Sequence, residues 1–173
     1  SHKAITYVDV GAFIGEVYMK MKELKRVNIR EAHLFEPNPE SYEQLVKNIE
    51  TFPSASLHTY NIGIGKEKSK ALFSAAKSMT KQMQAPTDVS KSLNTFECEI
   101  VPLREFATTF TEGHIHLLKV DVEGNELSVF EGVSELLEAQ QIDMIYMEVG
   151  FNQNGTQQTY FCKVDAVLQQ YGY

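Results

Sequence analysis

Short apolar segments alternate with longer segments of helical periodicity along this chain of 173 residues. The first apolar segment spans 4–10 and ends in a turn that contains two glycines. After the turn, apolar residues recur at the spacing of one helix face: Ile14, Val17, Met21 and Leu24. Such alternation is typical of βαβ units. It predicts an α/β, Rossmann-like fold, a mostly parallel central sheet with helices on both faces.

Similar patterns place the remaining elements. Further strands are expected at 32–35, 56–60, 115–122 and 144–149, with shorter strands or hairpin arms at 72–73 and 96–101. The last two core strands are apolar on both faces, which predicts central strands covered on two sides. Asn38 and Pro39 indicate the start of a helix whose buried face holds Tyr42, Leu45, Val46 and Ile49. A final amphipathic helix contains Phe161, Val164, Val167, Leu168 and Tyr171. The polar segment 77–94 is typical either of a lid or of disorder.

The length fits one domain, 1–173, rather than two. A net charge of -7 and a pI near 5.2 argue against a nucleic-acid partner. The sequence contains neither a run of about 20 apolar residues nor the pattern of a signal peptide, so we expect a cytoplasmic protein without a membrane partner. Cys98 and Cys162 lack metal-binding or redox spacing, and two buried, reduced thiols are expected.

Polar side chains follow the predicted parallel strands where each strand ends. They are Asp9, Glu36, Asn61, Asp121 with Glu123, and Glu148. In an open parallel sheet, ligands bind beyond the carboxyl ends of the strands. These residues therefore predict a ligand site at one edge of the sheet. His114 and His116 precede the strand at 115–122 and are expected at the opposite end, in a surface or packing role.

The turn from Asp9 to Gly15 brings backbone and a helix N-terminus close to this edge. Gly11 and Gly15 are also compatible with a tight strand-to-helix turn that binds nothing. Glu36 follows the turn by about 20 residues, where an acid accepts hydrogen bonds from ribose hydroxyls in nucleoside-binding sheets. The combination favours a ligand that contains adenosine.

The residue in the middle of the turn separates two classes of cofactor. A dinucleotide fingerprint requires glycine at the position of Phe13, so that backbone can contact pyrophosphate. Asp9 would in addition repel phosphate, whereas it suits the sulfonium and ammonium groups of S-adenosyl-L-methionine, directly or through water. We therefore predict this methyl donor rather than NAD.

Three sequence blocks resemble FkbM-type methyltransferases in their order and spacing. They are 8–15 (VDVGAFIG), 35–39 (FEPNP) and 118–126 (LKVDVEGNE), with further similarity at 101–106 and 144–148. The resemblance implies a class I methyltransferase fold that binds S-adenosyl-L-methionine. It places Asp9 and Gly11 near the methionine part of the cofactor, Glu36 on the ribose, and Asn61-Ile62 near the adenine. Ala12, Phe13, Gly15, Pro37 and Asp121 complete the expected cofactor-binding set.

The same resemblance points to O-methylation of a sugar or small natural product, so the expected partner is a small-molecule or glycan acceptor. Phe13 stands where the family commonly has Asn, and the acid often found at the third strand is here an amide or absent.

Many methyltransferases of this fold end with an antiparallel strand pair, which this sequence lacks. If the domain is complete as given, we expect self-association into a homo-oligomer or marginal stability. Ser1-His2 resembles the remnant of an expression tag, and we expect the native chain to continue past Tyr173.

Asp121 is the first candidate for the base or acceptor-orienting group, with Glu123 and Glu148 as further catalytic candidates. Asp121, Glu123 and Lys119 would lie on one side of the strand if it continued that far. Alternatively, Glu123 and Glu126 stabilise the start of the next helix and Lys119 pairs with a carboxylate. Oxygen ligands at Asp121, Glu123 and Glu148 suit magnesium or calcium, but their spacing is not diagnostic and no metal is predicted. Two other functions stay open: a noncatalytic nucleoside-binding module and an NAD(P)-dependent oxidoreductase.

Overall fold

The computed structural model describes residues 3–24, 27–52, 56–76, 79–82, 95–148 and 156–173, with backbone alone for 75–76, 79–82 and 156–160. The strands are β1 (Ala4–Val10), β2 (Asn28–Phe35), β3 (Leu57–Tyr60), β4 (Gly63–Ile64), β5 (Ser69–Ala76), β6 (Met79–Gln82), β7 (Thr95–Val101), β8 (Leu117–Val120) and β9 (Ile145–Met147). The α-helices are α1 (Glu16–Leu24), α2 (Pro39–Ile49), α3 (Glu126–Gly132), α4 (Ser134–Glu138) and α5 (Thr156–Gln170). Two 3-10 helices, η2 (Leu103–Thr109) and η3 (Thr111–Gly113), precede β8.

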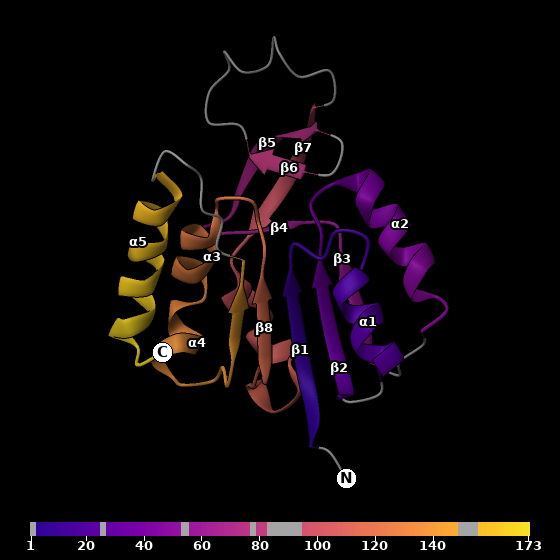
Figure 1. Ribbon diagram of the computed structural model, residues 1–173, viewed down its shortest axis with the longest axis horizontal. Coiled ribbons are helices and arrows are strands. Elements are labelled where there is room, and N and C mark those ends of the chain that lie inside the picture. The colour runs from indigo at the N-terminus through magenta and orange to yellow at the C-terminus, as the bar shows by residue number, and fades with distance from the viewer. Residues whose placement is uncertain (1–2, 25–26, 53–55, 77–78, 83–94, 149–155) are drawn as a thin grey trace.

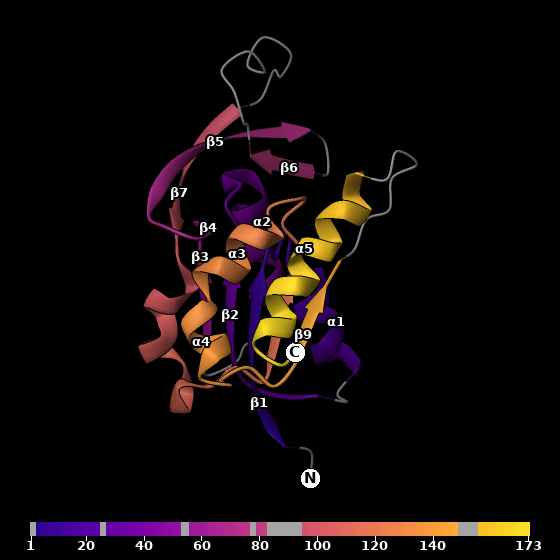
Figure 2. The ribbon, with the colours of Figure 1, turned by 90° about the vertical axis from the view of Figure 1, so that its left-hand side faces the viewer.

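Five parallel strands form the central sheet in the order β3-β2-β1-β8-β9. Side chains alternate between its two faces, as the strand period requires. Val8 and Val10 pack with α3, α4 and α5, whereas Tyr7 packs with α1 and α2. Figures 1 and 2 show the resulting three layers. The predicted Rossmann-like fold is therefore confirmed.

A second, four-stranded sheet in the order β4-β7-β5-β6 lies beyond the carboxyl ends of the central strands (Figure 1). β5 is antiparallel to both β7 and β6, which confirms the predicted pair of hairpin arms. The segment expected to be a lid or disordered, 77–94, contains β6, so the prediction was wrong for these four residues. The rest of that segment lies outside the described residues.

The start of α2 follows directly from its sequence. Asn38 is the N-cap, and its Oδ1 accepts hydrogen bonds from the backbone N–H groups of Glu40 (2.9 Å) and Ser41 (3.4 Å). Pro39 occupies the first turn, where its missing N–H has no cost. The helix buries Leu45 and Ile49 against the sheet, as predicted.

The buried face of α1 differs from the prediction. Val17 and Leu24 are 39% and 52% exposed, whereas Tyr18 is fully buried and its Oη donates to the backbone oxygen of Phe52 over 3.4 Å. The helix begins only at Glu16, after the turn, and its rotation is set by Tyr18 with the half-buried Met21. The prediction was correct for Met21 but wrong for Val17 and Leu24, and it missed Tyr18.

The last two core strands are shorter than predicted. β8 covers Leu117–Val120, so Asp121 and Val122 lie beyond the strand, and Ile115 forms only an isolated bridge with Ile142. β9 is the outermost described strand, and its flanking Met144 is 62% exposed. Within the described part of the chain, β9 is covered on one face only: Ile145 and Met147 pack against the core, whereas Tyr146 on the other face is 59% exposed. None of the helices described is long and apolar enough to cross a membrane.

The corrected face of α1 can be tested by a pair of truncations. Tyr18→Ala should lower the free energy of unfolding by about 3–5 kcal/mol, because it leaves a cavity between α1 and the sheet. Val17→Ala removes a neighbouring, partly exposed side chain and should change it by less than about 1 kcal/mol. Urea denaturation followed by circular dichroism measures both. Equal losses would contradict the observed orientation of the helix.

Candidate functional site

A pocket lies at the carboxyl ends of β1, β2 and β8, and residues of the small sheet also line it. Backbone and side chains from both sheets line it. The lining residues are Val10, Gly11, Phe13, Phe35, Glu36, Pro37, Ile62, Gly63, Ile64, Phe73, Ile100, Asp121, Val122, Glu123 and Asn125. Of the predicted site, the structure brings together Gly11, Phe13, Glu36, Pro37, Ile62, Asp121 and Glu123.

Sequence reasoning missed the apolar wall of the pocket. Phe73 on β5 and Ile100 on β7 come from the small sheet, and Ile64 comes from β4. The patterns at 72–73 and 96–101 predicted strands but carried no signal that these strands fold over the ligand edge, and no strand was predicted at Ile64. Asn125 was also missed as a site residue, although it lies within the block 118–126 that contains Asp121 and Glu123.

The turn after β1 is held by hydrogen bonds within the protein. The backbone N–H groups of Gly11 and Ala12 both donate to the Phe35 oxygen, at 3.0 and 2.9 Å, and that of Gly15 donates to the Ala12 oxygen at 2.8 Å. Gly11 has a φ of +83°, and a Cβ on it would lie 1.8 Å from the backbone oxygen of Asp121. Glycine at position 11 is therefore required by the close approach of the β1 and β8 ends, with or without a ligand.

Glu36 connects this turn to the end of β2. Its Oε2 accepts from the backbone N–H of Phe13 and its Oε1 from that of Asn38, each at 2.8 Å. Burial raises the pKa of Glu36 to about 7, although these two amides oppose the shift. Glu36 thus lines the pocket as a carboxyl group that changes charge near neutral pH.

Two pocket residues have strained backbone. Phe13 and Glu123 have φ values of 50° and 54°, in the left-handed region that residues other than glycine seldom adopt. Such conformations cost about 1–3 kcal/mol each and are found preferentially at functional sites. β8 ends at Val120, so Asp121 and Glu123 reach the pocket from the loop after the strand and not by strand parity.

Lys119 holds three acceptors beneath the pocket. Its Nζ lies 3.0 Å from Asp9 Oδ1, 3.0 Å from the Gly11 oxygen and 3.5 Å from Asp121 Oδ2. Burial lowers the pKa of Lys119, but the Asp9 and Asp121 carboxylates outweigh it and raise the pKa overall. The Tyr7 hydroxyl donates to the other Asp9 oxygen over 2.7 Å. Lys119 is therefore a buried ammonium that joins the ends of β1 and β8.

Five predicted site residues lie outside the pocket lining. Asp9 is fully buried, since Lys119 and Tyr7 hold its carboxylate. Ala12 is a buried residue of the turn. A Cβ on Gly15 would lie 2.7 Å from Leu45 Cδ1, so Gly15 allows the turn to pack closely against α2. Asn61 donates from Nδ2 to the backbone oxygens of Glu36 and Pro37, which positions that loop. Glu148 is exposed after the outermost strand, contrary to its expected buried or cleft-facing position.

The other expectations from sequence have clear outcomes. Glu126 begins α3, and its Oε1 accepts from the Gly124 N–H over 3.1 Å, as expected of an acid at a helix start. His114 and His116 lie at the amino end of β8, away from the pocket, as predicted. Both cysteines are free thiols, and Cys98 is buried as predicted, but the prediction was wrong for Cys162, which is exposed.

Removing the buried ammonium should destabilise the protein strongly. Lys119→Met leaves Asp9 buried without its cation and should cost about 3–5 kcal/mol of unfolding free energy. Asp9→Asn in the same chain removes the unpaired charge, and the double variant should be more stable than Lys119→Met alone. Urea denaturation of the wild type, Lys119→Met, Asp9→Asn and the double variant measures the coupling free energy between the two residues.

The exposed Lys70 provides the control for this cycle. Its Nζ lies 3.1 Å from Glu97, and 73% of its side chain is accessible. Lys70→Met should therefore change stability by no more than about 1 kcal/mol. If Lys119→Met were equally mild, Asp9 would not depend on Lys119.

The parallel sheet, the glycine turn and the carboxylate-lined pocket define a Rossmann-like α/β domain with a ligand site at the carboxyl ends of its strands. The family model described as "Methyltransferase FkbM domain" matches residues 9–173. The chain belongs to this family of methyltransferases, which confirms the resemblance seen in the sequence.

Two solved structures share the fold. Methyltransferase FkbM from Methylobacillus flagellatus KT has a TM-score of 0.67 and 14% identity, over 98% of this chain and 38% of that chain. Precorrin-6y C5,15-methyltransferase from Geobacter metallireducens GS-15 has a TM-score of 0.51 and 12% identity, over 100% of this chain and 65% of that chain. This chain thus spans less than two thirds of either protein. No curated protein matches the sequence.

Proposed function

We propose that the pocket binds S-adenosyl-L-methionine and that the protein transfers its methyl group to a hydroxyl of a sugar or small natural product. The charge of the pocket carries this proposal. Glu36, Asp121 and Glu123 line it, and its lining within the described chain contains no Lys, Arg or His. Such a site suits a ligand with a sulfonium and an ammonium group and is unfavourable for a pyrophosphate.

The hydrogen bonds of the turn also separate the methyl donor from a dinucleotide. A pyrophosphate-binding turn presents free backbone N–H groups to the phosphates. Here the N–H groups of Gly11, Ala12 and Phe13 already donate to the end of β2. This arrangement supports a nucleoside ligand without phosphates and counts against the NAD(P)-dependent oxidoreductase.

Glu36 and Asp121 have distinct roles in the proposed reaction. Glu36 accepts hydrogen bonds from the ribose hydroxyls, and Pro37 and Ile62 contact the adenine. Methyl transfer is an in-line displacement, so the protein contributes chiefly by holding the acceptor oxygen against the methyl carbon. A hydroxyl acceptor must also lose its proton. We assign this step to Asp121, whose side chain stays 31% accessible while Lys119 holds one of its oxygens.

Binding of the product S-adenosylhomocysteine tests the cofactor assignment. Calorimetry should show one site per chain, with no comparable binding of NADH. Asp121→Asn should abolish or strongly reduce methyl transfer from labelled S-adenosyl-L-methionine to a panel of sugars and hydroxylated compounds. Glu148→Gln is the matched control, because Glu148 is an exposed acid outside the pocket. Tighter binding of NADH than of S-adenosylhomocysteine would overturn the proposal, and binding without transfer to any acceptor would favour a noncatalytic module.

Affinity for S-adenosylhomocysteine should depend on pH through Glu36. Burial places its pKa at about 7, above the ordinary value of a glutamic acid, so a large fraction is neutral at pH 6. Ribose hydroxyls donate to the ionised form and therefore favour loss of the proton. Affinity should rise about tenfold from pH 6 to pH 8, since binding at pH 6 must first release that proton. Calorimetry in two buffers of different ionisation enthalpy detects the released proton; affinity independent of pH would contradict this role.

A further inference from the structure

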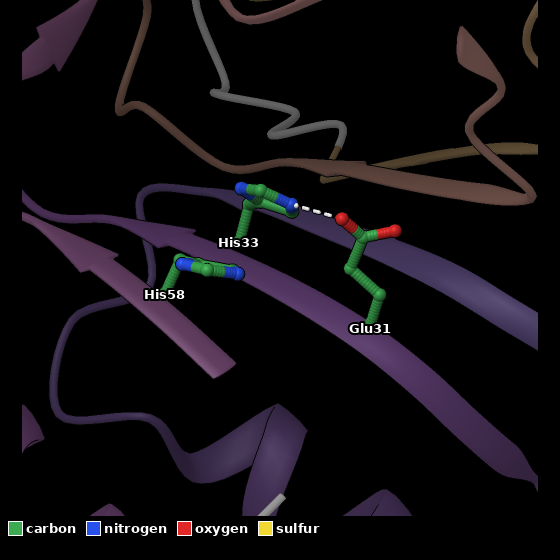
Figure 3. A group of neighbouring side chains, drawn as sticks. All are labelled: Glu31, His33 and His58. Carbon is green, nitrogen blue, oxygen red and sulfur yellow. Dashed lines mark hydrogen bonds and ion pairs between the residues drawn. The ribbon is translucent and has the colours of Figure 1, made fainter. Parts of the chain in front are cut away.

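A polar cluster on the central sheet is separate from the pocket. Glu31 and His33 lie two residues apart on β2, and His58 is the cross-strand neighbour of His33 on β3. Figure 3 shows the two imidazole rings stacked, with the Glu31 carboxylate directed toward His33. Each residue offers one ligand atom, and the three atoms lie within 4.8 Å of one another. None of the three residues lines the pocket.

We propose that Glu31, His33 and His58 bind a divalent transition-metal ion such as zinc. Two imidazoles and one carboxylate form a common zinc ligand set, with a fourth position left for water. His33 Nε2 and Glu31 Oε1 are already 2.9 Å apart. Zinc bonds of about 2.0–2.2 Å would separate them by only slightly more, so these two ligands need little movement. His58 is exposed and is the ligand that turns inward.

The second nitrogen of His33 supports metal binding. Its Nδ1 lies 3.0 Å from the Tyr60 hydroxyl, which can either donate or accept a hydrogen bond. Without metal, Nε2 carries the proton toward Glu31. With metal, the proton moves to Nδ1 and is accepted by Tyr60, which leaves the Nε2 lone pair for the ion. Such an outer partner fixes the tautomer of a metal-binding histidine.

Glu31 has equivalent outer support. Its Oε2 accepts from the backbone N–H of Thr111 (2.9 Å) and from the Thr6 hydroxyl (3.3 Å), which leaves Oε1 for the ion. Glu31 Oε1 and His33 Nε2 therefore face each other while the second polar atom of each side chain has a hydrogen-bond partner elsewhere.

A second group with comparable spacing provides a contrast. His114, His116 and Asp143 also lie within 4.8 Å at their ligand atoms. However, His116 Nδ1 accepts a hydrogen bond from the backbone N–H of Thr6 over 3.0 Å, so its proton is kept on Nε2. Lys3 Nζ lies 3.9 Å from Asp143 and adds a competing cation. The hydrogen bonds therefore favour the Glu31, His33 and His58 group.

Zinc titration against a chromophoric chelator tests the site, with the full chain and no added polyhistidine. The wild type should bind one zinc ion, and His58→Ala should weaken binding at least tenfold. His58 is exposed, so this variant should fold like the wild type, which circular dichroism verifies. Tyr60→Phe keeps all three ligands but removes the outer partner of His33, and should weaken binding by about 10–100-fold.

The matched control is His114→Ala, which removes an imidazole from the contrasting group and should leave zinc affinity unchanged. Zinc binding should also raise the melting temperature of the wild type and of His114→Ala but not that of His58→Ala. The proposal is overturned if the wild type binds no zinc, if His58→Ala binds as tightly as the wild type, or if His114→Ala removes the binding. Neither readout depends on methyl transfer, so the proposal is tested independently of the proposed function.

Discussion

The buried Lys119 ammonium is the interaction on which the geometry of the pocket depends. It contacts a carboxylate of β1, the backbone oxygen of the glycine turn and the carboxylate that follows β8. These three acceptors match the three donors of an ammonium group. Because the backbone of Asp121 leaves no room for a Cβ on Gly11, a small movement of either strand end would displace the turn. Lys119 thus fixes the ends of β1 and β8 together with the glycine turn that follows β1.

The same interaction determines which charges face the ligand. Asp9 is neutralised below the turn, so the negative character of the pocket arises from Glu36, Asp121 and Glu123. Glu36 in turn holds the N–H groups of Phe13 and Asn38. Asp9 therefore affects the pocket through Lys119, whereas Glu36 both lines the pocket and holds the turn in place.

The sequence contained most of the core and part of the site. Most strands and the cap at Asn38 could be predicted because they follow from local periodicity and backbone chemistry. The buried role of Asp9 could not, since it depends on Lys119, which lies 110 residues away. Phe73 and Ile100 were missed for a similar reason: their own segments predict strands, but the position of those strands over the pocket is a tertiary property. Glu148 was misplaced because an apolar strand at a sheet edge resembles one in its centre.

The small sheet has a core cluster of its own and also contributes a wall of the pocket. Its strands pair only with one another, and Phe73, Cys98 and Ile100 form a core cluster of their own. Phe73 and Ile100 nevertheless form a wall of the pocket. Substitutions there can reshape the pocket without disturbing the parallel sheet or the Lys119 contacts. The shape of this wall and the packing of the parallel sheet are therefore encoded in different stretches of sequence.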